Sequence, residues 1–357
     1  MKIFLISNMY PSKNDGLFGV FVKNFKEEFE SQGIKFTAKS VIKGKSYSAP
    51  KKLFRYLIHY LSILKNYTFC RYDFIYLHYL THHLPILLVL LPFKNKPWVI
   101  NAHGNDFSYL ERKKFYKSIA SKILKRIELI VVPSSYLKYE ILKNYPFLSE
   151  KDIFVSPSGG IDPALFYKEK NKPQNSTLNL GFVSRLIEEK GWKTFLKALV
   201  MLQNEGIPFT ATIAGKGPDE EKIKTFIKEH DLSNVNFIGF VKQNELVHLY
   251  NQFDIYIFPT YHDSLGLTGV EAMACGTPVI ASNIEGPSTY VQHEVNGFLF
   301  ESKNSQALFE CINSFLKMNS SSKEAMRQEA LKHAQNYKKD LVAKRLISRL
   351  NSLLNPK

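Results

Sequence analysis

Short apolar runs alternate with longer amphipathic segments along the first half of the chain. Apolar residues at helical spacing between the first two runs predict a helix over 20–30. Near-continuous apolar runs are typical of strands buried on both faces, so the pattern predicts a parallel sheet between two layers of helices. The predicted strands of this half are 2–7, 36–41, 74–78, 98–102, 129–133 and 153–156.

A polar stretch over 167–177 interrupts this alternation and predicts a linker. A second alternating set of strands and helices follows it. Two helices, over 305–317 and 323–353, are predicted to close the chain. The predicted strands of the second set are 178–183, 210–214, 235–238, 255–258 and 278–281.

These patterns predict an α/β protein with two doubly wound, Rossmann-like domains, which a length of 357 residues also favours. We expect the first domain over 1–170, the second over 171–335, and a last helix, 336–357, that crosses back to the first. Ligands of such sheets bind beyond the carboxyl ends of the strands. We therefore expect one site, in a cleft between the domains, lined by the loops that follow residues 7, 102, 183, 214 and 258.

A cationic pair follows the strand predicted at 178–183. Arg185 and Lys190 stand where this strand gives way to a helix, and both side chains can reach one anionic group. The N-terminus of a helix adds backbone donors that suit a phosphate. The alternative is a solvated helix start, because Arg and Lys are common surface residues.

An acidic pair follows a later strand of the same half. Asp263 precedes a turn that contains Gly266 and Gly269, and Glu271 lies on a short predicted helix that begins near Leu267. The glycines would let backbone N–H groups approach a ligand closely. Carboxylates accept hydrogen bonds in pairs, as sugar and ribose hydroxyls require. In the alternative, Asp263 caps the helix and Glu271 complements its dipole.

Four segments resemble motifs of the retaining glycosyltransferases with the two-domain GT-B fold, specifically family 4. Residues 181–191, GFVSRLIEEKG, resemble the family's G-R-L-x-x-x-K-G element. Residues 258–278, FPTYHDSLGLTGVEAMACGTP, resemble its P-S-x-x-E-G-F-G-L-x-x-x-E-A-M-A-x-G-x-P signature. The shorter segments 213–218, IAGKGP, and 155–162, VSPSGGID, resemble its I-x-G-x-G-P turn and P-N-G-I-D crossover. The resemblance implies the GT-B fold and transfer of a sugar, with retention, from a nucleotide diphosphate donor.

The resemblance also implies a role for each matching residue of the second half, which would bind the nucleotide sugar. Arg185 and Lys190 would hold the donor diphosphate and stabilise the charge that develops on it. Glu271 would accept hydrogen bonds from the ribose hydroxyls, and Asp263 from hydroxyls of the transferred sugar. The remaining implied contacts come from Gly266, Leu267 and Thr268 at the phosphates, and from Gly239 to Val241 at the base.

In the first half, which the resemblance makes the acceptor side, two loops match the family. The turn 8–19 resembles the glycine loop beside the diphosphate and acceptor, with Gly16 and Gly19 near the following helix. The alternative is an ordinary turn rich in Pro, Asn, Asp and Gly. Residues 102–106, AHGND, resemble a His-Gly element, in which His103 would contact the sugar or its reaction centre. A lone loop histidine is otherwise more often structural.

Three positions depart from the family pattern. Asp263 stands where glutamate is usual, Ser264 where glycine is usual, and Thr289 where a later glutamate is usual. These changes leave the identity of the donor sugar and base open.

The net charge of +16 is concentrated in the first half. Residues 1–170 carry 27 Lys and Arg against 13 Asp and Glu, whereas residues 171–357 carry 21 against 19. This asymmetry predicts an anionic surface or polymer as a partner of the first half.

Two basic segments indicate what that surface is. In 50–65, a stripe of leucines is surrounded by Lys and Arg, and 112–126 combines seven Lys and Arg with apolar residues. A helix lying on an anionic membrane has this pattern. In the alternative, the apolar stripe faces the core and only the polar face is solvated. The leucines of the stripe are Leu53, Leu57, Leu61 and Leu64.

Absent patterns narrow the function further. The three cysteines have no metal-ligand spacing, and neither Asp-x-Asp nor His-Glu-x-x-His occurs, so we expect a metal-independent enzyme without cofactor in a reducing cytoplasm. The start of the chain does not resemble a signal peptide, and the apolar run 84–93 is too short to span a membrane. We therefore expect a cytoplasmic protein on the inner face of the cytoplasmic membrane, with a glycan or lipid-linked acceptor.

Two other functions fit parts of this description. A nucleotide-sugar epimerase of the same fold would act on the donor without an acceptor, and product analysis with donor alone separates the two. A non-enzymatic nucleic-acid binder would explain the basic composition, but no recognition motif of that class is visible, so we expect no nucleic-acid partner.

Overall fold

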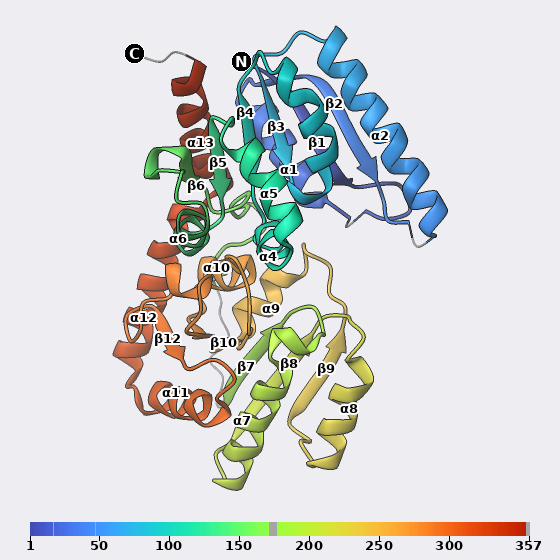
Figure 1. Cartoon of the computed structure of the whole chain (residues 1–357). Helices are drawn as coiled ribbons and strands as arrows, with labels where there is room; N and C mark the ends of the chain where they lie inside the picture. Colours follow the sequence, from blue (N-terminus) through green and yellow to red (C-terminus); the bar gives the residue numbers. More distant parts are fainter. Residues whose placement is uncertain (17, 47, 171–176, 355–357) are drawn as a thin grey trace. The chain divides into compact units, whose positions relative to one another are not determined.

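The computed structural model divides into two compact units (Figure 1). It describes residues 1–16, 18–46, 48–170 and 177–354. Unit 1 comprises residues 1–159 together with the C-terminal segment from Lys339, and unit 2 comprises residues 160–338. The boundary precedes the one predicted at residue 170, because Ile161 and Phe166 are buried in the core of unit 2. Of the predicted linker, 171–176 lie outside the described residues.

Unit 1 is built on a six-stranded parallel sheet with the strand order β2-β1-β3-β4-β5-β6. Alternate side chains of β1 enter two different cores, because successive residues of a strand point to opposite faces. Phe4 and Ile6 pack against α2 to α6, whereas Ile3 and Leu5 pack against α1 and the C-terminal helix α13. The strands are β1 (Lys2–Tyr10), β2 (Lys35–Lys43), β3 (Phe74–His78), β4 (Trp98–Asn101), β5 (Leu129–Val132) and β6 (Ile153–Val155). The helices are α1 (Val20–Ser31), α2 (Ala49–Phe69), α3 (Leu84–Leu90), α4 (Asn105–Arg112), α5 (Lys114–Leu124), α6 (Ser135–Asn144) and α13 (Lys339–Leu354).

Unit 2 holds a second parallel sheet of six strands, in the order β12-β11-β10-β7-β8-β9. One face of this sheet packs on α7, α8 and α11, and the other packs on α9, α10 and α12. The strands are β7 (Leu178–Val183), β8 (Phe209–Ala214), β9 (Val235–Gly239), β10 (Ile255–Phe258), β11 (Val279–Ser282) and β12 (Gly297–Phe300). The helices are α7 (Trp192–Asn204), α8 (Glu220–Glu229), α9 (Leu246–Gln252), α10 (Leu267–Ala274), α11 (Ser305–Lys317) and α12 (Ser320–Ala334).

The structure confirms the predicted α/β class with two Rossmann-like sheets, and corrects three elements. The first strand continues to Tyr10, so Asn8 belongs to a strand and not to the turn that follows. The single helix predicted over 323–353 is wrong, because a 3₁₀ turn at Gln335–Tyr337 separates α12 from α13. Strand β12 was not predicted.

Candidate functional site

In unit 2, β7 and β10 are neighbours at the centre of the sheet. The chain runs from β7 through β8 to β9 on one side and returns to β10 on the other. Ligands of doubly wound sheets bind where the strand order reverses in this way, beyond the carboxyl ends of the strands. The loops at this point are 184–191 and 259–266, and they carry Arg185, Lys190 and Asp263.

These two loops are fastened to each other. Gly191 has a φ of 75°, and a Cβ atom at this position would lie 1.8 Å from the carbonyl oxygen of Pro259. Only a glycine permits this approach. The Tyr261 N–H and the Thr260 hydroxyl both donate to the carbonyl oxygen of Glu189, at 2.8 and 3.2 Å. The separation of the charged side chains on the two loops is therefore set by the fold of unit 2.

Lys190 and Asp263 form an ion pair across these loops. The Lys190 ammonium lies 2.6 Å from Asp263 Oδ2, and both side chains are largely buried. Arg185, in contrast, is exposed. The sequence predicted Lys190 as one half of a cationic pair, and the structure gives it a carboxylate partner. An anionic ligand would compete with Asp263 for this ammonium.

Glu271 lies within α10, on a helix that is almost wholly buried. Its side chain is only 8% exposed, and the Tyr250 hydroxyl donates to its Oε2 at 3.1 Å. Burial raises the pKa of Glu271 to about 7, although the Tyr250 hydrogen bond acts in the opposite direction. A carboxyl group with this pKa gains from any ligand that donates further hydrogen bonds to its ionised form. Sequence analysis missed Tyr250, because a tyrosine on a neighbouring amphipathic helix is more often part of the core.

The alternative that Asp263 caps α10 is wrong. Asp263 Oδ1 accepts from Leu265 N–H at 3.2 Å, before the helix begins, and Gly266 occupies the N-cap. Gly266 was expected to let a ligand approach the backbone, and it also packs against Phe258. A Cβ atom there would lie 2.4 Å from the Phe258 ring, so a glycine is needed for packing as well as for approach to a ligand.

The remaining predicted residues of unit 2 lie at the start of α10 and at the end of β9. Leu267 and Thr268 form the first turn of α10, whose N–H groups have no partner within the helix. Gly239 ends β9, and its carbonyl oxygen accepts from Gly215 N–H at 2.7 Å. Val241 follows it and is half-buried.

In unit 1, the glycine turn begins only after Tyr10, where β1 ends. Gly19 has a φ of 70°, and a Cβ atom there would lie 2.5 Å from the backbone of Met9, so the turn folds tightly against the end of the strand. Gly16 is exposed, with open space around it. Residue 17, between these glycines, lies outside the described residues.

His103 follows β4 and belongs to a group of stacked aromatic rings. Its Nε2 lies 3.2 Å from His78 Nδ1, and its ring stacks on Tyr79 with the centroids 5.7 Å apart. Burial lowers the pKa of His103 to about 4, so the ring is neutral near pH 7.

Asp106 fixes the position of this histidine. Its oxygens accept from the N–H groups of His103, Phe107 and Leu80, at 3.0, 3.1 and 3.3 Å. Burial nevertheless raises the pKa of Asp106 to about 6. The carboxyl group therefore holds the loop after β4 and the start of α4 in place.

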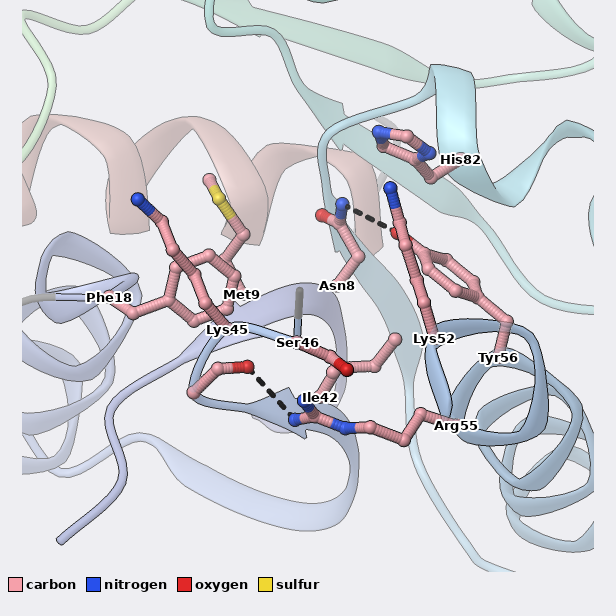
Figure 2. A pocket seen from close by; sticks show the side chains of 11 residues that line it. Asn8, Met9, Phe18, Ile42, Lys45, Ser46, Lys52, Arg55, Tyr56 and His82 are labelled. Carbon is pink, nitrogen blue, oxygen red and sulfur yellow. Dashed lines mark hydrogen bonds between the residues drawn. The ribbon is translucent and has the colours of Figure 1, made fainter. Parts of the chain in front are cut away.

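A pocket lies at the carboxyl ends of β1 and β2, and part of its lining comes from the segment 8–19 that was expected beside the acceptor. Its volume is about 290 Å³, and Figure 2 shows the side chains that line it. Asn8 contributes from β1, Lys52, Arg55 and Tyr56 from α2, and His82 from the turn after β3. Asn8 lies in the segment 8–19 that was expected beside the acceptor, although it belongs to β1 and not to the turn. Sequence analysis missed Tyr56, because the leucine stripe dominated the pattern of its helix.

That leucine stripe does not face the core. Leu53, Leu57 and Leu61 are 74%, 54% and 56% exposed, and only Leu64 packs against the sheet. The buried face of α2 is formed by His59 and Ile63. The core-facing alternative is therefore wrong for three of the four leucines.

The second basic segment behaves differently. Ile119 and Ile123 of α5 pack into the core of unit 1, whereas Phe115 is exposed. No helix among the described residues has the length and apolar character to cross a membrane. No three of their His, Cys, Asp or Glu side chains gather as metal ligands.

Two family models together match most of the chain. Residues 165–333 match the family model of the group 1 glycosyl transferases, and residues 19–164 match that of glycosyltransferase family 4. The 2-deoxystreptamine glucosyltransferase of Streptomyces kanamyceticus is 34% identical over 115 residues, which are 32% of this chain and 30% of that protein. The amylovoran biosynthesis glycosyltransferase AmsK of Erwinia amylovora is 33% identical over 156 residues, 42% of this chain and 38% of that protein. The chain thus matches less than half the length of either relative.

Solved structures share the fold over the full chain. A sucrose-phosphate synthase from Thermosynechococcus elongatus has a TM-score of 0.81 at 17% identity, with 100% of both chains covered. Anabaena HepE in complex with UDP has a TM-score of 0.77 at 18% identity, with 99% of this chain and 100% of that one covered.

Proposed function

Because the chain belongs to the group 1, family 4 glycosyltransferases, we propose that it transfers a sugar from a nucleotide diphosphate donor to an acceptor. The observation that carries this proposal is the arrangement at the strand-order reversal of unit 2. Lys190 and Asp263 meet there on two fastened loops, beside a helix that buries Glu271. The same place binds ligands in other doubly wound sheets.

The donor contacts follow from the chemistry of these groups. Arg185 and Lys190 would bind the diphosphate, together with N–H groups of the first turn of α10. Glu271 would accept from ribose hydroxyls, which favour its ionised form, and Asp263 from hydroxyls of the sugar. HepE, which has the same fold, was solved with UDP, and this supports a nucleotide ligand.

The reaction would run with retention and without metal or other cofactor. Cationic side chains and helix N–H groups would stabilise the charge that develops on the leaving diphosphate. The neutral ring of His103 would contact the sugar as a hydrogen-bonding group and not as a charged acid.

The acceptor would be a glycan or a lipid-linked sugar at an anionic membrane surface, and the enzyme a cytoplasmic, peripheral one. The exposed leucines of α2 support this proposal, because apolar side chains among basic ones are typical of helices that lie in the membrane interface. Lys51, Lys52 and Lys65 would add about 1 kcal/mol each near anionic lipid.

The test is a thermal-shift panel of nucleotide sugars on the full chain, followed by product analysis with the best one. We expect at least one to raise the melting temperature, because a ligand that binds the folded state alone stabilises it. Glu271→Gln should abolish this shift, whereas Glu229→Gln, an exposed glutamate at the end of α8, should leave it unchanged.

Two outcomes would contradict the proposal. If no nucleotide sugar stabilised the protein, or if Glu271→Gln responded as the wild type does, the assigned donor site would be wrong. Conversion of the donor in the absence of any acceptor would indicate an epimerase instead.

A further inference from the structure

A second hollow of unit 1 adjoins the pocket of Figure 2. Its volume is about 560 Å³, within the range of roughly 300–1,000 Å³ that is usual for small-molecule sites. Lys52, Tyr56 and His82 line both spaces. The lining specific to the larger hollow is mainly aromatic or apolar, with Leu53, Tyr60, Tyr79, Pro85, Tyr109 and Tyr116.

The two spaces differ in charge. The smaller pocket is lined by Lys45, Lys52 and Arg55, and neither lining contains an Asp or Glu. Arg55 donates to the carbonyl oxygens of Lys43 and Gly44, so its guanidinium is held by the backbone. No carboxylate of the described residues forms an ion pair with Lys45 or Lys52, although Asp15 Oδ2 accepts from the backbone N–H of Lys45 at 3.1 Å. Both ammonium groups are therefore available to an anion. In Figure 2 the end of the Lys52 side chain lies beside the His82 ring, and both residues line the two spaces.

Asn8 supplies a hydrogen-bond acceptor to the smaller pocket. The residue is 7% exposed, and its Nδ2 donates to the Tyr56 hydroxyl at 3.3 Å. Its Oδ1 is buried and has no hydrogen-bond partner in the described part of the chain. A buried acceptor without a partner costs roughly 1–3 kcal/mol. An ionised phosphate has no hydrogen to offer this atom, whereas a sugar hydroxyl has one.

Tyr79 shows local strain at the same place. It adopts a φ of 73°, which is uncommon for a residue with a bulky side chain. Its ring stacks with those of His82 and His103, at centroid distances of 5.9 and 5.7 Å. Such strain is concentrated at functional sites in proteins. Tyr79 thus connects the aromatic hollow with the loop that carries His103.

We propose that the two spaces form one acceptor site for a sugar that is linked through phosphate to a single hydrocarbon chain. A sugar hydroxyl donates to Asn8 Oδ1, the phosphate binds Lys52 and Lys45, and the chain lies in the aromatic hollow against Tyr109 and Tyr116. This inference rests on the proposed function and specifies its acceptor. The site joins the exposed leucines of α2 through Leu53, which belongs to both, so the chain can enter from the apolar surface of that helix.

The test measures binding of decyl phosphate, below its micellar concentration, to the full chain without nucleotide sugar, by calorimetry. Decyl glucoside and inorganic phosphate are the comparison ligands. We expect decyl phosphate to bind at least about tenfold more tightly than either, because it alone combines an anionic group for Lys45 and Lys52 with a chain that fills the aromatic hollow.

Substitutions separate the two parts of the site. Lys52→Ala should weaken decyl phosphate about tenfold and leave decyl glucoside unchanged, because a charge-assisted contact is lost. Lys51→Ala is the matched control: it removes the same charge from the same helix but does not line either space. The exposed pair Tyr109→Ala and Tyr116→Ala together should weaken both decyl ligands and spare inorganic phosphate.

Three results would overturn the inference: decyl phosphate that binds no better than inorganic phosphate, equal effects of Lys51→Ala and Lys52→Ala, or tyrosine variants without effect. The nucleotide-sugar panel on the same preparation separates the two proposals. A positive panel with no decyl phosphate binding refutes this acceptor site alone. A negative panel refutes the proposed function, whatever decyl phosphate does.

Discussion

Lys190 and Asp263 neutralise each other, although the proposed function assigns them to different parts of a nucleotide sugar. A diphosphate bound between Arg185 and Lys190 would replace Asp263 as the partner of the ammonium group. The freed carboxylate would then be available to hydroxyls of the sugar. Recognition of the two parts of the donor would thereby be coupled, since the diphosphate and the sugar hydroxyls would both compete with this ion pair.

At this scale the sequence predicted which residues lie near the strand-order reversal, but not how they pair. Arg185, Lys190, Asp263 and Glu271 all lie at or beside the strand-order reversal of unit 2. The ion pair could not be predicted, because it joins residues 73 positions apart and depends on how two loops are fastened. The roles assigned to these residues stay predictions.

Glu271 gives a prediction for stability against pH. Burial raises its pKa from 4.5 to about 7 in the folded state, so the folded protein binds a proton that the unfolded chain has already released. The contribution of Glu271 to stability is therefore full below about pH 4.5 and is lost as the pH rises to about 7, by on the order of 3 kcal/mol. Glu271→Gln cannot ionise, so its stability relative to wild type should increase across this range. Denaturant unfolding at pH 5 and pH 8 measures the difference.

The control is Glu229→Gln, which should show no such trend relative to wild type, since this side chain is exposed. A constant difference between Glu271→Gln and wild type at both pH values would show that Glu271 ionises normally in the folded protein.

At the scale of elements, the strands with continuous apolar runs were the most predictable features. The strands 74–78, 178–183 and 255–258 match the observed bounds, because buried parallel strands leave continuous apolar runs. The break between α12 and α13 was not predictable. It contains neither Gly nor Pro, and it occurs where Tyr337 is held in the core of unit 2 while Leu346 belongs to that of unit 1.

The orientation of α2 was likewise beyond sequence analysis. The helix α2 has one stripe of leucines and a second stripe that combines His59 with Ile63. Either stripe could have faced the sheet. Here the face with His59 and Ile63 is buried: His59 and His83 pair through their Nε2 atoms at 3.0 Å, and Ile63 belongs to the core of unit 1. The leucines are left outside as an apolar surface.

This orientation predicts how the protein binds membranes. Leu57→Ser and Leu61→Ser together should weaken binding to anionic vesicles roughly tenfold or more, because two side chains no longer insert into the interface. Wild-type binding should also fall as salt increases, because the basic residues contribute through screened charges. Vesicle co-sedimentation over a range of salt concentrations measures both effects.

Val295→Ser provides the matched control, since Val295 is an exposed apolar residue of unit 2. If it weakened vesicle binding as much as the α2 double variant, the apolar surface of α2 would not be the docking site. Vesicle binding that did not change with salt concentration would argue against anionic lipid as the partner of this surface.

At the scale of the molecule, unit 2 is inserted into unit 1. The chain leaves unit 1 after β6 and returns to it only with α13, which covers the same face of the sheet as α1. Ala343, Leu346 and Leu350 are buried there among side chains of β1 and β3. Unit 1 is therefore complete only once residues on both sides of unit 2 have been synthesised.

This arrangement predicts a local destabilisation. Leu346→Ala and Leu350→Ala should each lower the free energy of unfolding of unit 1 by about 2–5 kcal/mol, because each leaves a cavity against the sheet. Hydrogen exchange should accelerate in β1 and β3 and stay unchanged in β7 and β10, whose cores contain no residue of α13. Ser348→Ala, on the exposed face of the same helix, should change neither. Equal acceleration in both sheets would mean that the two units unfold as one cooperative body, and α13 would then stabilise the whole chain rather than the unit it completes.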